Sequence, residues 1–118
     1  MHIIANIAIG LIGILHIYIL VLEMFLWDKP TGLRAFHQTQ EAATASKVLA
    51  ANQGLYNGFL AAGLFWGLFL GSDGTGVKVF FLACVLVAGL YGSATANRKI
   101  LFIQAIPAAV ALMFVWLS

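Results

Sequence analysis

An acidic side chain, Glu23, stands near the end of an otherwise apolar run of the sequence, residues 3–27. An ionised carboxylate costs about 2.5–3.5 kcal/mol at the centre of a membrane helix, and less toward the interface. A carboxylate kept there is therefore paired, hydrated or used, as a proton acceptor, a counter-ion or a general acid or base. Glu23 is the first candidate for the chemistry of this chain.

His16 precedes Glu23 by two helical turns, so the two side chains share one stripe of a helix. They would lie about 10 Å apart along the axis, a separation that a bound substrate can bridge and a direct hydrogen bond cannot. A charged imidazolium near the bilayer centre would be costly, which favours the neutral ring. His16 and Glu23 are the candidate catalytic pair. For His16, a hydrogen bond to another helix is the alternative.

The densest polar patch lies in a second apolar run and contains Asn52, Gln53, Tyr56 and Asn57. Asn52 and Tyr56 are four residues apart, as are Gln53 and Asn57, so one helix would present a broad polar face. Polar side chains between membrane helices contribute about 0.6–2 kcal/mol each, and Glu23 could simply bond Asn52 or Gln53. This patch is richer than such packing needs, and we expect it to line a ligand site.

Polar residues of four apolar runs fall about 3–14 Å below one membrane interface, at a rise of about 1.5 Å per residue. The opposite leaflet is almost free of them, which predicts a polar pocket facing the cytoplasm, with an apolar plug on the outer side. It argues against an open pore, which would need a polar lining throughout. The predicted ligand-binding residues are Glu23, His16, Asn52, Gln53, Tyr56, Asn57, Tyr91, Ser93 and Gln104.

The composition predicts an integral membrane protein. Of 118 residues, 63% are hydrophobic and 8% charged, whereas soluble domains carry about a quarter charged residues. The apolar runs cover about residues 3–27, 48–70, 77–96 and 100–117. They predict an all-α, four-transmembrane-helix up-down bundle in one domain, 1–118. Pro107 should kink the fourth helix, and the second should start early and project from the membrane.

The positive charges predict the orientation. The connection between the second and third runs would lie on the same side of the membrane as both termini, and of the six Lys and Arg residues only Lys78 falls on that side. The others lie in or beside loops 28–47 and 97–99, namely Lys29, Arg34, Lys47, Arg98 and Lys99. The positive-inside rule places those loops in the cytoplasm and both termini outside, in a multi-pass plasma-membrane protein.

Other kinds of site are not indicated. No Cys/His cluster has metal-ligand spacing, no cofactor motif occurs, and no basic block suggests a nucleic acid partner. Cys84 reads as a small buried hydrophobe. Glycines repeat at intervals of four (Gly54 and Gly58; Gly63, Gly67 and Gly71), forming grooves that serve either packing within one chain or a homo-oligomer. The expected partners are the lipid bilayer and a small-molecule ligand.

Two segments carry a resemblance, residues 22–27 (LEMFLW) and 49–61 (LAANQGLYNGFLA). They resemble a family of small bacterial four-helix membrane proteins catalogued as a domain of unknown function, some members of which are labelled "epimerase". The resemblance covers nearly the whole chain and implies the fold, without an activity.

Three functions remain open at this point. The first is binding or transport of a small, partly apolar or cationic molecule, with Glu23 as its proton or charge partner. The second is a membrane-embedded isomerase or epimerase that uses Glu23 and His16 as acid and base. The third is a structural subunit of a membrane complex, whose polar groups meet a partner helix.

Overall fold

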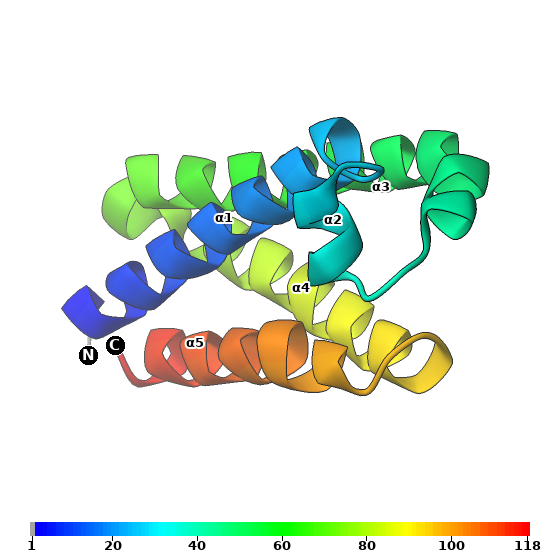
Figure 1. Cartoon of the computed structure of the whole chain (residues 1–118). Coiled ribbons are helices and arrows are strands. Elements are labelled where there is room, and N and C mark those ends of the chain that lie inside the picture. The colour runs from blue at the N-terminus through cyan, green and yellow to red at the C-terminus, as the bar shows by residue number, and fades with distance from the viewer. Residues whose placement is uncertain (1) are drawn as a thin grey trace. The chain divides into compact units, whose positions relative to one another are not determined.

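Residues 2–118 are described by the computed structural model, and they form helices joined by short connections, with no strand. Five α-helices follow one another along the chain (Figure 1), with one 3₁₀ turn and one π turn between them. In order, these are α1 (His2–Phe25), α2 (Pro30–Ala35), α3 (Gln40–Phe69), the 3₁₀ turn η1 (Gly71–Gly74), α4 (Thr75–Thr95), the π turn η2 (Leu101–Ala105) and α5 (Ile106–Leu117). The prediction of an all-α protein is confirmed.

The connection predicted over residues 28–47 is partly helical. It contains α2, which begins at Pro30, where a missing N–H costs nothing in a first turn. It also contains the start of α3 at Gln40, with Glu41 in the first turn, so the early start of this helix is confirmed. At about 1.5 Å per residue, the 30 residues of α3 span about 45 Å, more than the hydrocarbon core of a bilayer.

The last helix departs from regular geometry just before Pro107. Residues Leu101–Ala105 form a π turn, in which the N–H of Ile106 bonds the carbonyl of Leu101. A proline at position 107 cannot donate to Ile103 and its ring crowds that carbonyl. The wider turn relieves this conflict. The kink predicted at Pro107 stays a prediction.

By its internal contacts the chain divides into two compact units. The first unit comprises Met1–Ile14 and Leu60–Ser118, and thus the start of α1, the end of α3, and all of α4 and α5. In its core, α1, α3 and α4 contribute large aliphatic side chains, and α5 contributes alanines. The buried residues are Ile9, Ile12, Leu64, Leu82, Val85, Ala108 and Ala111.

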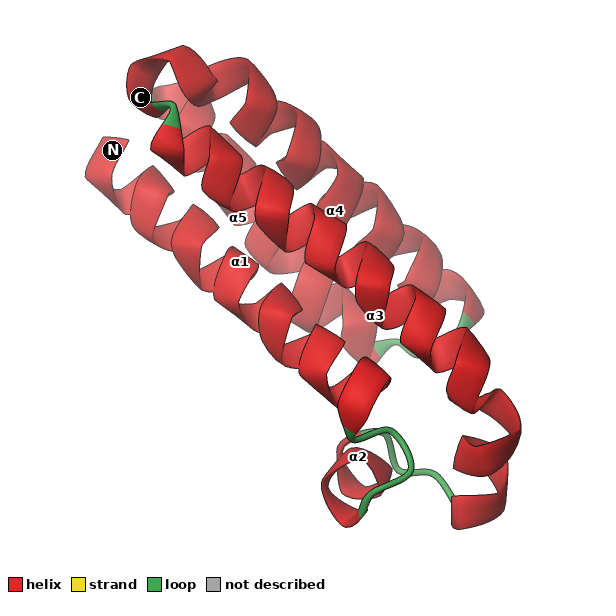
Figure 2. Cartoon of the chain, turned by 90° about the horizontal axis from the view of Figure 1, so that it is seen from above, coloured by secondary structure: helices red, strands yellow, loops and turns green. Residues whose placement is uncertain are grey.

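Glycines allow the helices of the first unit to approach closely. A methyl group added at Gly89 of α4 would lie 2.6 Å from the backbone nitrogen of Ala105 in η2, and one at Gly63 would lie 2.3 Å from the ring of Phe81. Figure 2 shows the side-by-side course of α4 and α5 that the first contact permits. These glycines serve packing within the chain, and homo-oligomerisation through the grooves stays a prediction.

The second unit, Leu15–Phe59, contains the end of α1, α2 and the beginning of α3. Trp27 packs on Phe36 with ring centroids 4.8 Å apart, and its indole Nε1 donates to Ser46 Oγ at 3.1 Å. Asp28 and Lys47 form an ion pair at 3.1 Å. A tilted ring contact, a hydrogen bond and an ion pair thus join the turn after α1 to Phe36, which follows α2, and to the beginning of α3.

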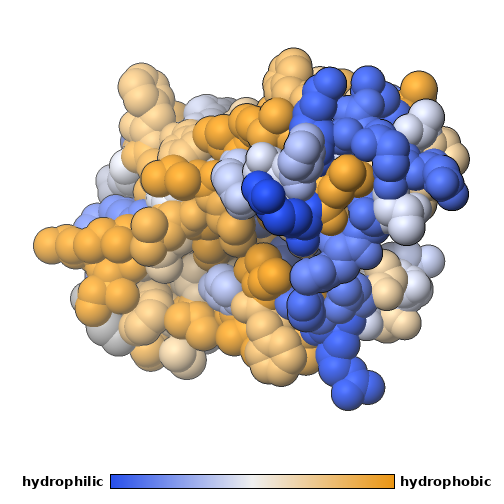
Figure 3. All heavy atoms as spheres, in the orientation of Figure 1, coloured by the Kyte–Doolittle hydropathy of each residue, from blue (hydrophilic) through white to orange (hydrophobic). Residues whose placement is uncertain are grey.

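Large hydrophobic side chains cover much of the surface, including the face of α1 and α5 seen in Figure 3. Trp116 and Phe69 are each 87% exposed, which is costly in water and favourable in lipid. Two segments, His2–Phe25 and Gly71–Thr95, are long and apolar enough to cross a membrane, and Leu101–Leu117 is apolar but shorter. Two of the four predicted spans therefore meet the criteria of length and apolarity, and the other two stay predictions.

Candidate functional site

The side chain of Glu23 is buried, with 7% of its surface exposed, and it meets α3 inside the second unit. Its Oε1 accepts a hydrogen bond from Asn57 Nδ2 at 2.6 Å. The same amide group also donates to the carbonyl of Gln53 at 3.2 Å, which accounts for both of its N–H bonds. The group that contacts this oxygen of the carboxylate is therefore a neutral amide.

The hydrogen-bond partner of Glu23 is Asn57. The partners expected from the sequence, Asn52 and Gln53, do not fill this role. Side chains on a helix lean toward its N-terminus. On the end of α1 this lean carries Glu23 toward the start of that helix, and on the antiparallel α3 it carries Asn57 toward Gln40. The two side chains consequently meet one turn farther along α3 than depth alone suggests.

Gly54 makes this meeting possible. A methyl group added to Gly54 would lie 2.6 Å from Met24 Cγ, 3.1 Å from Glu23 Cβ and 3.3 Å from the carbonyl oxygen of Leu20. Since Gly54 has no side chain, α1 rests on the backbone of α3 at this level. The glycine of the predicted groove therefore positions the candidate acid.

The remaining polar residues of α3 face outward. Asn52 is exposed, and its amide donates to the carbonyl of Val48 at 2.9 Å. Gln53 is exposed, and Tyr56 is 58% exposed with its ring beside that of Phe59. These three side chains form an outward polar face of α3, whereas Asn57 turns toward Glu23.

His16 is fully buried on α1, on the same stripe as Glu23. Both residues belong to the second unit, about 10 Å apart along the helix axis by the regular rise. Their use as an acid–base pair stays a prediction.

The other predicted site residues belong to the first unit. Tyr91 is 72% exposed, and the Ser93 hydroxyl donates to the carbonyl of Leu90 at 2.8 Å, within its own helix. Gln104 lies in the π turn and is half-buried. A ligand site that unites them with Glu23 stays a prediction.

The ion pair between Asp28 and Lys47 lies in the second unit, where the apolar part of α1 gives way to a segment rich in polar residues. The hydrogen bond from the Lys47 side chain lowers the pKa of Asp28 below its ordinary value, against a smaller opposing effect of burial. Ser46, beside this pair, accepts from Trp27 and donates to the carbonyl of Ala42 at 2.8 Å. Tryptophan beside paired charges is typical of a membrane–water interface.

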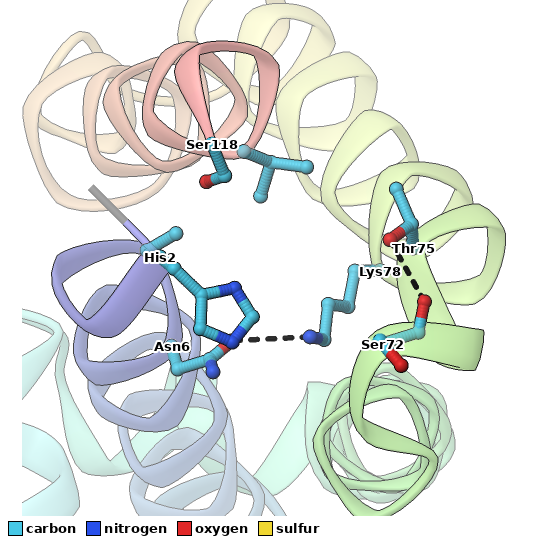
Figure 4. Close-up of a pocket in the computed structure, with 8 residues that line it drawn as sticks. His2, Asn6, Ser72, Thr75, Lys78 and Ser118 are labelled. Atoms are coloured by element: carbon cyan, nitrogen blue, oxygen red, sulfur yellow. Dashed lines mark hydrogen bonds between the residues drawn. The ribbon is translucent and has the colours of Figure 1, made fainter.

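A second polar centre, in the first unit, was not anticipated. Lys78 is 4% exposed, and its Nζ donates to Asn6 Oδ1 at 3.1 Å and to the carbonyl of Gly71 at 3.3 Å. The group borders a cavity of about 190 Å³, shown in Figure 4. We call it the Lys78 cavity; its lining residues are His2, Ala5, Asn6, Ser72, Thr75, Lys78, Val115 and Ser118. The sequence signal for it was a lone charge at the start of an apolar run.

Comparison with known proteins gives a family and no activity. Residues 10–116 match a family described as "Protein of unknown function (DUF1304)". The chain is also 34% identical over 96 residues to the "Uncharacterized protein YpaA" of Lactococcus lactis subsp. lactis (strain IL1403), covering 80% of this chain and 81% of that protein. No solved structure matches the chain.

Proposed function

The chain belongs to the DUF1304 family of unknown function, and we propose that it is an integral membrane protein whose buried Glu23 binds a small cationic or hydrogen-bond-donating molecule. The observation that carries this proposal is the 2.6 Å contact of Glu23 with Asn57. A neutral amide satisfies one oxygen of the carboxylate and leaves its charge uncompensated. A cation that brings N–H donors would supply the missing charge.

The proposed membrane arrangement has four spans, formed by α1, α3, α4 and α5. α1 and α4 have the required length and apolarity, and the exposed tryptophan and phenylalanine side chains of α3 and α5 favour lipid around these helices as well. Residues 28–47 and 97–99 would lie in the cytoplasm and both termini outside, as the distribution of Lys and Arg indicates.

The position of Glu23 on α1 supports binding rather than a purely structural contact. Trp27 and the Asp28–Lys47 pair lie one turn further along the chain, at the proposed interface. Glu23 is therefore about 6 Å deep by the helical rise, close enough to water for a ligand or a proton to reach it. A carboxylate at that depth costs less than one at the centre of the bilayer.

Native mass spectrometry of protein released from mild detergent tests the proposal. We expect a small-molecule adduct on the wild type and its loss in Glu23→Gln, which keeps the shape and removes the charge. Glu41→Gln is the matched control, because Glu41 is an exposed acid in the first turn of α3. An adduct retained equally by Glu23→Gln would refute a ligand at this carboxylate.

The outward polar face of α3 favours a second candidate, a subunit of a larger membrane complex. Asn52, Gln53 and Tyr56 would be poorly accommodated by lipid and well accommodated by the polar groups of a partner helix. If the chain is such a subunit, the wild type, Glu23→Gln and Glu41→Gln would all lack a small-molecule adduct. A second protein would then co-purify with each of them. Replacing Asn52 and Tyr56 by leucine and phenylalanine would then release that partner.

A further inference from the structure

Lys78 combines burial with a missing counter-charge. An ammonium group has three N–H donors, and two of them are used by the neutral oxygens of Asn6 and Gly71. No Asp or Glu side chain lines the Lys78 cavity, and within residues 2–118 no carboxylate pairs with this lysine. The adjacent acid in the turn, Asp73, is exposed to solvent. A buried cation with neutral neighbours is costly unless an anion is bound nearby.

Besides Lys78, the Asn6 amide and the Ser72 hydroxyl can donate into the cavity, whereas the hydroxyl protons of Thr75 and Ser118 are donated to backbone carbonyls. Figure 4 shows Lys78 reaching from α4 toward His2 and Asn6 of α1, with Ser72 and Thr75 on the wall beside it. The oxygen of Asn6 is occupied by Lys78, so its amide N–H bonds remain for another acceptor. The N-terminal end of α4 adds a partial positive charge from the helix dipole. The C-terminal end of α5, at Val115 and Ser118, opposes this effect with a partial negative charge. The groups left to bind an oxyanion are therefore the Lys78 ammonium and its neighbouring N–H and O–H donors.

The backbone around Lys78 holds its ammonium in place. Gly71 adopts a φ of 63°, which glycine tolerates, and its carbonyl accepts from Lys78 Nζ. A methyl group on Gly67 would lie 2.8 Å from Lys78 Cγ, so the aliphatic stem rests on the bare backbone of α3. The cation is therefore fixed at the cavity wall instead of extending into solvent.

The volume and the position of the cavity narrow the choice of anion. A cavity of about 150 Å³ holds a molecule the size of benzene, so about 190 Å³ accommodates a phosphate group. The lining comes from the beginnings of α1 and α4, from the 3₁₀ turn η1 and from the end of α5. If these helices cross the membrane as proposed, the cavity lies at the depth of lipid headgroups.

We propose that the Lys78 cavity is a phosphate-binding site, in which Lys78 Nζ, Asn6 Nδ2 and the Ser72 hydroxyl hold the phosphate group of a lipid headgroup or of free phosphate. The site is separate from Glu23 and carries a charge of the opposite sign. Its phosphate chemistry does not depend on the ligand proposed for Glu23; only the lipid source depends on the membrane arrangement.

Two binding measurements distinguish the two sources. The whole protein is transferred into detergent micelles containing either phosphatidylglycerol or a phosphate-free glycolipid with the same acyl chains, and retained lipid is counted by native mass spectrometry. In parallel, thermal unfolding is followed while inorganic phosphate is titrated against chloride at equal ionic strength. Retained phosphatidylglycerol identifies the lipid headgroup, and stabilisation by inorganic phosphate with no retained lipid identifies free phosphate.

Variants test the role of Lys78. Lys78→Met should lower the affinity for the bound phosphate species about tenfold or more, the loss expected for a charge-assisted hydrogen bond. Lys47→Met, which removes the same charge from an exposed position, should leave the affinity unchanged. Equal binding by wild type and Lys78→Met, or no binding of either species by the wild type, would overturn the proposal.

If Lys78→Met fails to fold, a second variant, Asn6→Asp, still tests the site. The new carboxylate would stand 3.1 Å from Lys78 Nζ, where it supplies an internal counter-ion of the same size as the amide. The variant should fold at least as well as the wild type and should lose phosphate binding, since the carboxylate both neutralises Lys78 and repels the ligand. Unchanged phosphate binding by Asn6→Asp would likewise exclude the site.

Discussion

Trp27 and Ser46 join the end of α1 to the first turns of α3 through an indole-to-hydroxyl hydrogen bond of 3.1 Å. The residues that follow them, Asp28 in the turn after α1 and Lys47 in α3, form the ion pair of the same unit. The two contacts fix where α3 passes the end of α1, and the carboxyl group of Glu23 then lies opposite Asn57. The polar segment 28–47 therefore contributes directly to the position of the buried acid.

Removing the donor to Glu23 should destabilise the protein. Asn57→Ala leaves a buried carboxylate without its amide, and we expect a loss of about 1–3 kcal/mol in the free energy of unfolding, measured by denaturant titration in mixed micelles. Asn52→Ala is the control, because that side chain is exposed and bonds its own helix; its effect should stay below about 0.5 kcal/mol. Equal losses in the two variants would show that the contact with Glu23 contributes nothing.

The close approach at Gly54 predicts a steric cost. Gly54→Ala places a methyl group against Met24, Glu23 and the carbonyl of Leu20, and only the methionine can move easily. We expect a destabilisation of about 1–3 kcal/mol and loss of the adduct that depends on Glu23. Gly76→Ala is the matched control.

The control rests on the open surroundings of Gly76, which lies in α4 with nothing within 4 Å of an added methyl group. That substitution should stabilise the helix by about 0.5–1 kcal/mol. The two variants therefore change stability in opposite directions. A neutral or stabilising Gly54→Ala would contradict the packing of α1 on α3.

The ion pair of Asp28 predicts a contribution to stability that depends on pH. Its pKa is lowered in the folded state, because Lys47 stabilises the ionised form, so the unfolded state binds a proton more readily. The contribution is complete above the unfolded pKa and is lost as the pH falls through the folded pKa, below about 4. The melting temperatures of wild type and Asp28→Asn should converge in acid. A constant difference from pH 7 to pH 3 would argue against the pair as its cause.

The proposed orientation predicts which positions a membrane-impermeant thiol reagent reaches. In a Cys84→Ser background, a cysteine at Asp73, in the exposed turn before α4, should react in intact spheroplasts. A cysteine at Glu41, in the first turn of α3, should react only after permeabilisation. The reverse pattern would invert the topology, and reaction at both positions in intact cells would exclude it.

Local patterns in the sequence were sufficient for some of these features. The early start of α3, with Glu41 in its first turn, depends on neighbours along the chain, and this prediction agrees with the structure. For Pro107 the sequence predicted a kink, whereas the structure shows a π turn just before it. The partner of Glu23 depends on the direction in which side chains lean on two antiparallel helices, so depth alone selected the wrong turn of α3.

The Lys78 cavity illustrates the limit of such patterns. Lys78 entered the sequence argument as a charge that sets topology, and Asn6 did not enter it at all. Their contact depends on the packing of α1 beside α4. Spacing along the sequence does not reveal it, because the two residues are 72 positions apart. The sequence shows Lys78 as a lone charge in an apolar run, but it does not show which side chains surround it in the fold.

The π turn before Pro107 has a consequence for how this family can change in length. A π turn holds about one residue more than an α turn, and such bulges arise inside helices by single-residue insertion. In a relative without a proline at the position of Pro107, deleting one residue from Leu101–Ala105 would restore a regular turn without rotating Ala108 and Ala111 away from the core. Elsewhere in α4 or α5 the same deletion would turn the buried face by about 100°. Relatives that differ by one residue should therefore place their gap at this turn.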